Sequence, residues 1–484
     1  MIPFSEWRPD VADYNGQHSK YILNALPRGD GYGPVKDFSA YTAALPAACR
    51  GFFRALDDDG SVVTFAGTSA KLYKLDNTDF TWDDVSVGAG TYTALPTTGQ
   101  WQFEQFGLVV IAVQANAAPQ AFTLGTSSAF AALGGSPPNA AYVKAVGRFL
   151  VLSGLTSNPY RIHWSGLNAI TTWTSGVTSS DYQDLPDGGI VRGVAGGEYG
   201  LIFQDAAIRR MTYAPGSDYI FEIDRLSDDM GLLAPYSLVR AGASAFFRAA
   251  QGFYQIDGTG QIVPIGKERL DRTFQSEYDA ANPQLFIGAS DPRNSRVFWC
   301  YKTQANSTST FDYLLCYDYQ LQRWSKIELQ GEYLASFAQS GLTLDGLDII
   351  NASVDDMDLS LDDIAPASSP ELAIVNTAHK LGYFGGDNLE ATMDTAEQTA
   401  EPKRMYVQGV RPITDASTVY GSITKRERQA DSVTYSTETA ANTQGICPQR
   451  ASTRYARARV RIPEGETWTF ASGVEPIFRL EGMR

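Results

Sequence analysis

Apolar and polar residues alternate along most of the chain, which is the pattern of β-strands that bury one face. The segment 71–75, Lys-Leu-Tyr-Lys-Leu, shows this alternation clearly. The longer segment 60–87 is predicted to form a strand, a Gly-Thr-Ser turn, a second strand, an Asp-Asn turn and a third strand that carries Trp82. We therefore expect short antiparallel strands joined by tight turns.

The same unit returns along the chain, in segments 101–124, 142–173, 196–224, 245–266 and 295–329. The closing strands are mostly about 40–50 residues apart, which is the length of a four-stranded propeller blade. A single blade cannot bury both of its faces, whereas blades stacked around an axis form a continuous core. We predict an all-β chain whose main part is a β-propeller of about six blades. The tryptophans expected in the blade cores are Trp82, Trp164, Trp173, Trp299 and Trp324.

The propeller is expected to occupy residues 51–388, between two different parts. Residues 1–50 are rich in proline and contain the cluster Arg-Gly-Asp-Gly-Tyr-Gly-Pro at 28–34, so we expect an amino-terminal arm laid as a loop over the core or a partner. An acidic stretch near 341–370 breaks the rhythm, as an insertion or as part of an atypical last blade. In residues 389–484 polar and apolar residues alternate cleanly; in 456–462 the arginines lie on one face and the apolar side chains on the other. This segment predicts a small antiparallel sandwich whose polar outer face is basic.

Composition and charge narrow the possible functions. The chain has 484 residues, and 39 basic against 54 acidic side chains give a net charge of −15. We therefore do not expect tight, non-specific binding of DNA over the whole surface, whereas an acidic wall that repels DNA is compatible with this charge. We expect no secretion signal, because the start of the chain lacks the basic and apolar regions of a signal peptide. We also expect no insertion into a membrane, because the longest apolar run, residues 106–113, is too short to span a bilayer. Four widely spaced cysteines form no metal or disulfide pattern and predict buried thiols in a reducing compartment.

Two groups of residues have the composition of a chemical site. His163 and Ser165 share a strand face in the segment Arg-Ile-His-Trp-Ser, yet no nucleophile elbow surrounds the serine, so we interpret the segment as the packed edge of a blade. Five aspartates have the oxygen ligands that calcium prefers but lack the glycine and distal glutamate of an EF-hand loop. They are Asp355, Asp356, Asp358, Asp362 and Asp363. We predict no catalytic residue, no cofactor and no metal, and expect these aspartates to line a channel.

Three segments carry a resemblance to a known family. They are the blade at 159–173, with Pro-x-Arg-Ile-x-Trp-Ser and a closing Trp; the hairpin at 199–211 together with 228–258, which holds Phe-x4-Gly-Phe-Tyr-x2-Asp-Gly; and the blade at 296–325, which ends Asp-Tyr-Gln-Leu-Gln-Arg-Trp-Ser. In this order they resemble the propeller proteins of short-tailed bacteriophage virions, known as tail hub, nozzle or packaged DNA stabilisation proteins.

The resemblance implies a structural virion protein and not an enzyme. Such a protein would be made in the host cytoplasm and would form a ring of six copies below the portal and adaptor. The ring would extend or close the DNA exit channel, retain packaged DNA, let double-stranded DNA pass during ejection, and hold a needle, fibre or spike. The family carries no catalytic residues to transfer to this chain.

Two alternatives remain open at this point. A carbohydrate-binding or carbohydrate-cleaving propeller acting on host surface polysaccharide would need a deep central pocket with paired carboxylates and aromatic side chains. A cellular propeller adaptor would have no place in a virion.

Overall fold

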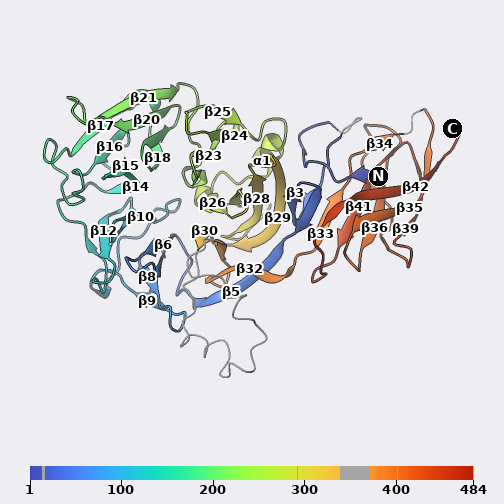
Figure 1. Ribbon diagram of the computed structural model, residues 1–484, viewed down its shortest axis with the longest axis horizontal. Helices are drawn as coiled ribbons and strands as arrows, with labels where there is room; N and C mark the ends of the chain where they lie inside the picture. Colours follow the sequence, from blue (N-terminus) through green and yellow to red (C-terminus); the bar gives the residue numbers. More distant parts are fainter. Residues whose placement is uncertain (13–16, 292, 338–370, 400–401, 483–484) are drawn as a thin grey trace.

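The computed structural model describes residues 1–12, 17–291, 293–337, 371–399 and 402–482. Within these residues the chain is all-β, with one short helix, α1 (Asp271–Glu277). Figure 1 shows the strands of the propeller arranged around an axis on one side and the carboxy-terminal module on the other, with the first strands of the chain between them. The predicted fold class is confirmed.

Within the described residues the propeller has seven blades of four antiparallel strands. Six blades are separate four-stranded sheets, and blade 6 is part of a ten-stranded sheet. Blade 1 contains β6 (Phe52–Leu56), β7 (Val62–Gly67), β8 (Leu72–Leu75) and β9 (Trp82–Asp84). Blade 2 contains β10 (Gln102–Phe106), β11 (Val109–Gln114), β12 (Ala117–Thr123) and β13 (Ala131–Ala132). Blade 3 contains β14 (Ala140–Val146), β15 (Phe149–Leu155), β16 (Arg161–Trp164) and β17 (Asp181–Asp184). Blade 4 contains β18 (Val191–Ala195), β19 (Gly200–Gln204), β20 (Ile208–Tyr213) and β21 (Phe221–Ser227).

Blades 5 and 6 follow in the same order. Blade 5 contains β22 (Val239–Ala241), β23 (Ser244–Ala249), β24 (Gly252–Ile256) and β25 (Ile262–Pro264). Blade 6 contains β26 (Ile287–Asp291), β27 (Arg296–Tyr301), β28 (Phe311–Asp318) and β29 (Arg323–Gly331). Four single-turn 3-10 helices lie between strands of the propeller, at Val87–Ala89, Pro186–Gly188, Pro235–Ser237 and Pro283–Leu285.

Blade 7 is built from two distant parts of the chain. Its inner strands are β30 (Tyr333–Phe337), β31 (Glu371–Val375) and β32 (Lys380–Asn388), and its outermost strand is β5 (Lys36–Ala44) from the amino-terminal segment. In Figure 1, β5 runs beside β32. The expected number of about six blades was one short, because sequence repeats reveal only blades made from one continuous segment. The amino-terminal strand β5 completes blade 7. Blade 7 closes the ring, because its innermost strand β30 packs against β6 of blade 1.

The amino-terminal segment is not a loop, so that expectation was wrong. β1 (Ile2–Pro3) and the hairpin of β3 (Ala25–Arg28) and β4 (Gly31–Pro34) pair with β42 (Ala471–Leu480) at the other end of the chain. The glycine-rich cluster forms this hairpin, and Gly31 has φ +144° with its Cα directly beside the Ala471 carbonyl. A side chain there would collide with the backbone, which explains the glycine.

The carboxy-terminal module is a sandwich of two sheets, as predicted. One sheet continues the order β3-β4-β42 with β35 (Met405–Thr414) and β39 (Cys447–Thr453). The other contains β33 (Ala391–Asp394), β41 (Ala458–Ile462), β36 (Tyr420–Lys425), β37 (Thr434–Tyr435) and β38 (Thr439–Ala440). A two-stranded ladder joins β34 (Gln398–Thr399) to β40 (Tyr455–Ala456). The apolar side chains of β41 are buried, which is the alternation seen in the sequence.

Propeller and sandwich share one continuous sheet of ten strands. The connecting strand is β2 (Ile22–Leu23), which pairs in parallel with β29 of blade 6 and antiparallel with β33 of the sandwich. In Figure 1, β29 lies at the side of the propeller that faces β33 of the sandwich. The amino-terminal segment also caps helix α1. The Asp10 carboxylate accepts hydrogen bonds from the backbone N–H groups of Arg272 at 2.7 Å and Thr273 at 2.9 Å, in the first turn of the helix.

Four of the five tryptophans expected in blade cores are buried. Trp299 and Trp324 stack with their ring centroids 5.5 Å apart, and Phe253 of blade 5 packs against both. Trp164 is buried between blades 3 and 4, and Trp173 is buried between blades 2 and 3. Trp82 is only half-buried, because it lies on the outermost strand of blade 1, where its indole N–H donates to the Ala43 carbonyl of β5 at 3.0 Å.

Candidate functional site

The inner strands of the propeller surround a hollow at its axis, which we call the axial cavity. Its main part has a volume of about 630 Å³, and a smaller part of about 330 Å³ shares Leu238, Arg240, Ile287, Gly288 and Tyr333 with it. The two parts together are lined from the first strands of all seven blades. This volume fits a small molecule or a few side chains. A DNA duplex is too wide to thread through it, since the major groove of the duplex alone admits a whole α-helix.

Charged side chains in the axial cavity come from four blades. Glu104 of β10 and Lys144 of β14 form an ion pair with 2.8 Å between Oε2 and Nζ. Arg54 of β6 and Arg240 of β22 line the smaller part. The Tyr142 and Tyr236 rings lie 6.2 Å apart beside them, and burial raises the pKa of Tyr236 to about 12.

Among the residues that the structure describes, the cavity lining offers one carboxylate, that of Glu104. The paired carboxylates that the carbohydrate-cleaving alternative requires are therefore not found among the described residues of this cavity. The aromatic side chains that it also requires are present. Inner-strand residues could not be assigned to the axis from the sequence, because alternation gives the face of a strand but not its position in a blade.

His163 and Ser165 are parts of blade 3. The Ser165 hydroxyl is fully buried; it accepts from the Leu150 N–H at 3.0 Å and donates to the Gly166 carbonyl at 3.0 Å. A ring nitrogen of His163 lies 3.1 Å from the Trp173 carbonyl, and burial lowers the pKa of this histidine. Among the described residues no hydrogen bond joins the two side chains, so both serve the packing of the blade.

The candidate channel-lining residues Asp355, Asp356, Asp358, Asp362 and Asp363 all lie outside the described residues. Within the described ranges, no group of three or more His, Cys, Asp or Glu side chains is arranged to hold a metal ion. All four cysteines are free and buried. Burial raises the pKa of Cys447 to about 11 and those of Cys49 and Cys316 to about 12, so these thiols are neutral and unreactive at physiological pH.

The expected basic outer face of the carboxy-terminal module is largely neutralised. Residues 389–484 hold 13 basic and 12 acidic side chains. Arg459 of β41 binds the buried Asp394 carboxylate through Nε at 2.6 Å, and Arg461 binds Glu438 and Glu390 at 2.7 and 2.8 Å. The sequence shows the arginine stripe, but the carboxylates that face it come from other strands.

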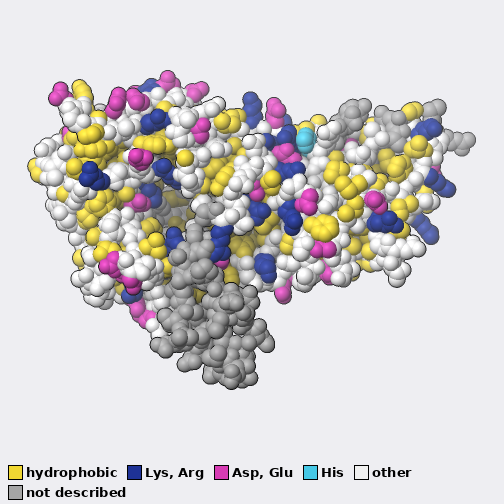
Figure 2. Space-filling model, viewed as in Figure 1, with side chains coloured by type: hydrophobic (Ala, Val, Ile, Leu, Met, Phe, Trp, Pro, Cys, Tyr) yellow, Lys and Arg dark blue, Asp and Glu magenta, His cyan; other side chains and the backbone are white. Residues whose placement is uncertain are grey.

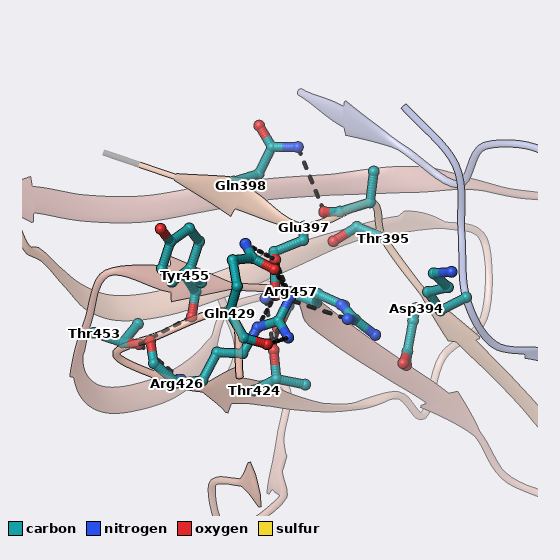
Figure 3. A network of polar contacts seen from close by, with 12 residues as sticks. Asp394, Thr395, Glu397, Gln398, Thr424, Arg426, Gln429, Thr453, Tyr455 and Arg457 are labelled. Carbon is teal, nitrogen blue, oxygen red and sulfur yellow. Dashed lines mark hydrogen bonds and ion pairs between the residues drawn. The ribbon is translucent and has the colours of Figure 1, made fainter. Parts of the chain in front are cut away.

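A second network is buried deeper in the module (Figure 3). Arg426 meets Glu397 with two hydrogen bonds, of 2.7 and 2.5 Å, and both side chains are almost completely buried. Arg457 approaches the same carboxylate at 3.7 Å, and the Gln429 amide donates to it at 3.2 Å. The Thr453 hydroxyl accepts from the Arg426 N–H at 3.1 Å. These bonds tie β36, β39 and the β34–β40 ladder together.

The exposed surface facing the reader in Figure 2 carries side chains of both signs. Acidic side chains are conspicuous along the outer edge of the propeller, above β21 and beside β9, while basic ones are frequent on the carboxy-terminal module. No described helix is long and apolar enough to cross a membrane.

Comparison with known proteins adds little to the fold. The sequence matches no family model and no curated protein. Among solved structures it is similar to the extracellular domain of the one component system BT4673 of B. thetaiotaomicron, with a TM-score of 0.44 and 10% identity, over 86% of this chain and 47% of that one. It is also similar to BBS1N in complex with ARL6DN (TM-score 0.39, 11% identity, 72% of this chain and 96% of that one).

A third similar structure is BamB from Moraxella catarrhalis (TM-score 0.36, 12% identity, 65% of this chain and 88% of that one). The chain spans about half the length of the BT4673 domain. Likeness at this level carries no argument about activity or partners, and the seven blades are established by the pairing of the chain's own strands.

Proposed function

We propose that this chain is a structural protein of a short bacteriophage tail. It would be a hub or nozzle that forms a homohexameric ring below the portal and adaptor. The ring would extend or close the DNA exit channel, retain packaged DNA and hold a needle, fibre or spike.

The observation that carries the proposal is where the resembling segments fall. Segment 159–173 contains β16 of blade 3, and 199–211 contains β19 and the start of β20 of blade 4. Segment 228–258 holds β22, β23 and β24 of blade 5, and 296–325 holds β27 and β28 of blade 6. The resemblance therefore follows four consecutive blades in order, instead of being scattered over unrelated elements.

The connection between propeller and sandwich also supports a mechanical role. A part that holds DNA inside a filled capsid must keep its shape, and a continuous sheet resists rotation better than a flexible linker. The axial cavity is too small for a duplex, so a DNA channel would have to lie between copies of the chain. The first 388 residues hold 26 basic and 42 acidic side chains, which favours repulsion of DNA from such a wall.

Electron cryomicroscopy of phage particles that contain the chain tests this proposal. We expect six copies around a channel of DNA width, next to the portal and adaptor. Particles assembled without the chain should fill with DNA and then lose it, while empty-head assembly stays normal. A single propeller on a fibre, or a chain absent from the particles, would overturn the proposal. Turnover of host polysaccharide by the purified chain would instead support the carbohydrate-cleaving alternative.

A further inference from the structure

The smaller part of the axial cavity concentrates positive charge in a protein that is acidic overall. It is lined by Arg54 and Arg240, and the adjoining main part adds Lys144 and Glu104. Lys144 and Glu104 neutralise each other in an ion pair with 2.8 Å between Nζ and Oε2. Among the described lining residues the net charge is therefore positive and resides on the two arginines, whereas the chain as a whole carries −15.

Arg240 is held by backbone and by an aromatic ring rather than by a carboxylate. Its guanidinium donates to the Gly196 carbonyl and to the Gly242 carbonyl at 3.2 Å, and it lies 5.6 Å from the centroid of the Tyr199 ring. These contacts fix the position of the guanidinium without neutralising it. The remaining N–H groups keep their capacity to bind an anion.

Arg54 is half-buried and lies on β6 of blade 1. No ion pair to Arg54 is formed by any carboxylate within the described residues. Burial lowers the pKa of this arginine, which reflects the cost of a charge that has lost part of its water. An anion that approached from the cavity would offset that cost, because attraction between opposite charges is stronger in a partly enclosed, less polar space.

We propose that the axial cavity binds a small oxyanion, a ligand carrying a phosphate or carboxylate group, between Arg54 and Arg240. Arginine suits this role because its planar guanidinium can give two parallel hydrogen bonds to such a group. The Tyr142 and Tyr236 rings offer an apolar wall for the rest of the ligand. The combined cavity has the size of small-molecule sites in proteins. This inference does not depend on the proposed function.

Isothermal titration calorimetry of the full chain tests the site, with inorganic phosphate and citrate as probes at constant ionic strength. We expect saturable binding of at least one probe, and their order of affinity shows whether the site favours phosphate or carboxylate. The variant Arg54→Gln should weaken binding at least tenfold, and Arg54→Lys should retain part of it, because the charge remains while the paired donors are lost.

The matched control is Arg479→Gln, which removes the same charge from an exposed arginine that lies over the Tyr406 ring, outside the cavity. It should bind both probes like the wild type. The proposal is overturned if neither probe binds the wild type, or if the two glutamine variants weaken binding equally, which would mean a general effect of net charge. Binding of a DNA duplex that requires Arg54 would also overturn it, since a duplex cannot enter the cavity.

Discussion

Asn24 bridges the propeller and the sandwich at the junction of β2, β29 and β33, which we call the seam, and its replacement should loosen this seam. Its side-chain N–H donates to the Glu390 carbonyl at 2.9 Å, and its side-chain oxygen accepts from the Glu328 N–H at 2.8 Å. Asn24 also adopts a left-handed backbone conformation, with φ +55°. Asparagine tolerates this conformation better than most residues, so one side chain both bridges the two parts and allows the turn after β2.

The cost of Asn24→Ala follows from these contacts. Two buried hydrogen bonds contribute roughly 1 kcal/mol each. A left-handed alanine costs about 1 kcal/mol more. The total is about 3 kcal/mol, which would raise the exchange rate of amides that open with the seam on the order of 100-fold. Asn24→Gly loses the same two bonds without the backbone strain and should cost about 2 kcal/mol.

Hydrogen exchange of the full chain, followed by mass spectrometry, measures the effect locally. Peptides covering β2, β29 and β33 should exchange faster in both variants, and more so in the alanine variant. Asn168 provides the control, because it has φ +54° in blade 3 and no side-chain hydrogen bond among the described residues. Asn168→Ala should leave the seam peptides unchanged. The reasoning is refuted if Asn24→Ala exchanges at the wild-type rate, or if Asn168→Ala loosens the same peptides.

Three further changes test the packing and electrostatics. Burial raises the pKa of Asp271 to about 6, so its carboxyl group binds a proton more tightly in the folded chain than in the unfolded chain, and the folded state is stabilised as the pH falls from about 6 to about 4. Asp271→Asn should remove up to roughly 2–3 kcal/mol of this pH-dependent stabilisation. Melting temperatures of the two proteins at pH 7 and 4.5 measure the difference. Gly67→Ala would bring a Cβ to 2.4 Å from the buried ring of Trp101 and should cost about 1–3 kcal/mol in thermal unfolding, while Gly29→Ala, with open space around it, should cost far less. Glu397→Gln removes the carboxylate that two buried arginines share and should destabilise the sandwich by about 3–5 kcal/mol. Hydrogen exchange should become faster in residues 389–480 and stay unchanged in blades 2–4. Exchange at the wild-type rate in the sandwich would contradict this prediction.

The sequence predicted the features that depend on neighbouring residues. Alternation and turn residues located six of the seven blades, and the alternation in 456–462 predicted the strand β41 and its buried face. The tryptophans expected in blade cores also followed from local pattern, although Trp101 was not singled out and is fully buried between blades 1 and 2. Its signal was present in Gly51 and Gly67, since the ring fills the space that side chains there would occupy.

Features that depend on distant residues could not be predicted. The amino-terminal segment looked like a loop because its strands are short and interrupted by proline and glycine. Its partners β42, β33 and β32 lie hundreds of residues away, so no local pattern marks them. The same reason hid the carboxylates opposite the arginine stripe of β41, and the fact that Arg54 and Arg240 line the same part of the axial cavity.

The amino-terminal segment pairs with strands in three different parts of the fold. β5 completes blade 7 and so closes the propeller, β2 joins blade 6 to the sandwich, and β1 pairs with β42 near the end of the chain. Each of these pairings joins residues more than 300 positions apart in the sequence, and such long-range contacts are slow to form. Once formed, they make the ring, the seam and the sandwich depend on one another, because releasing the segment would open all three.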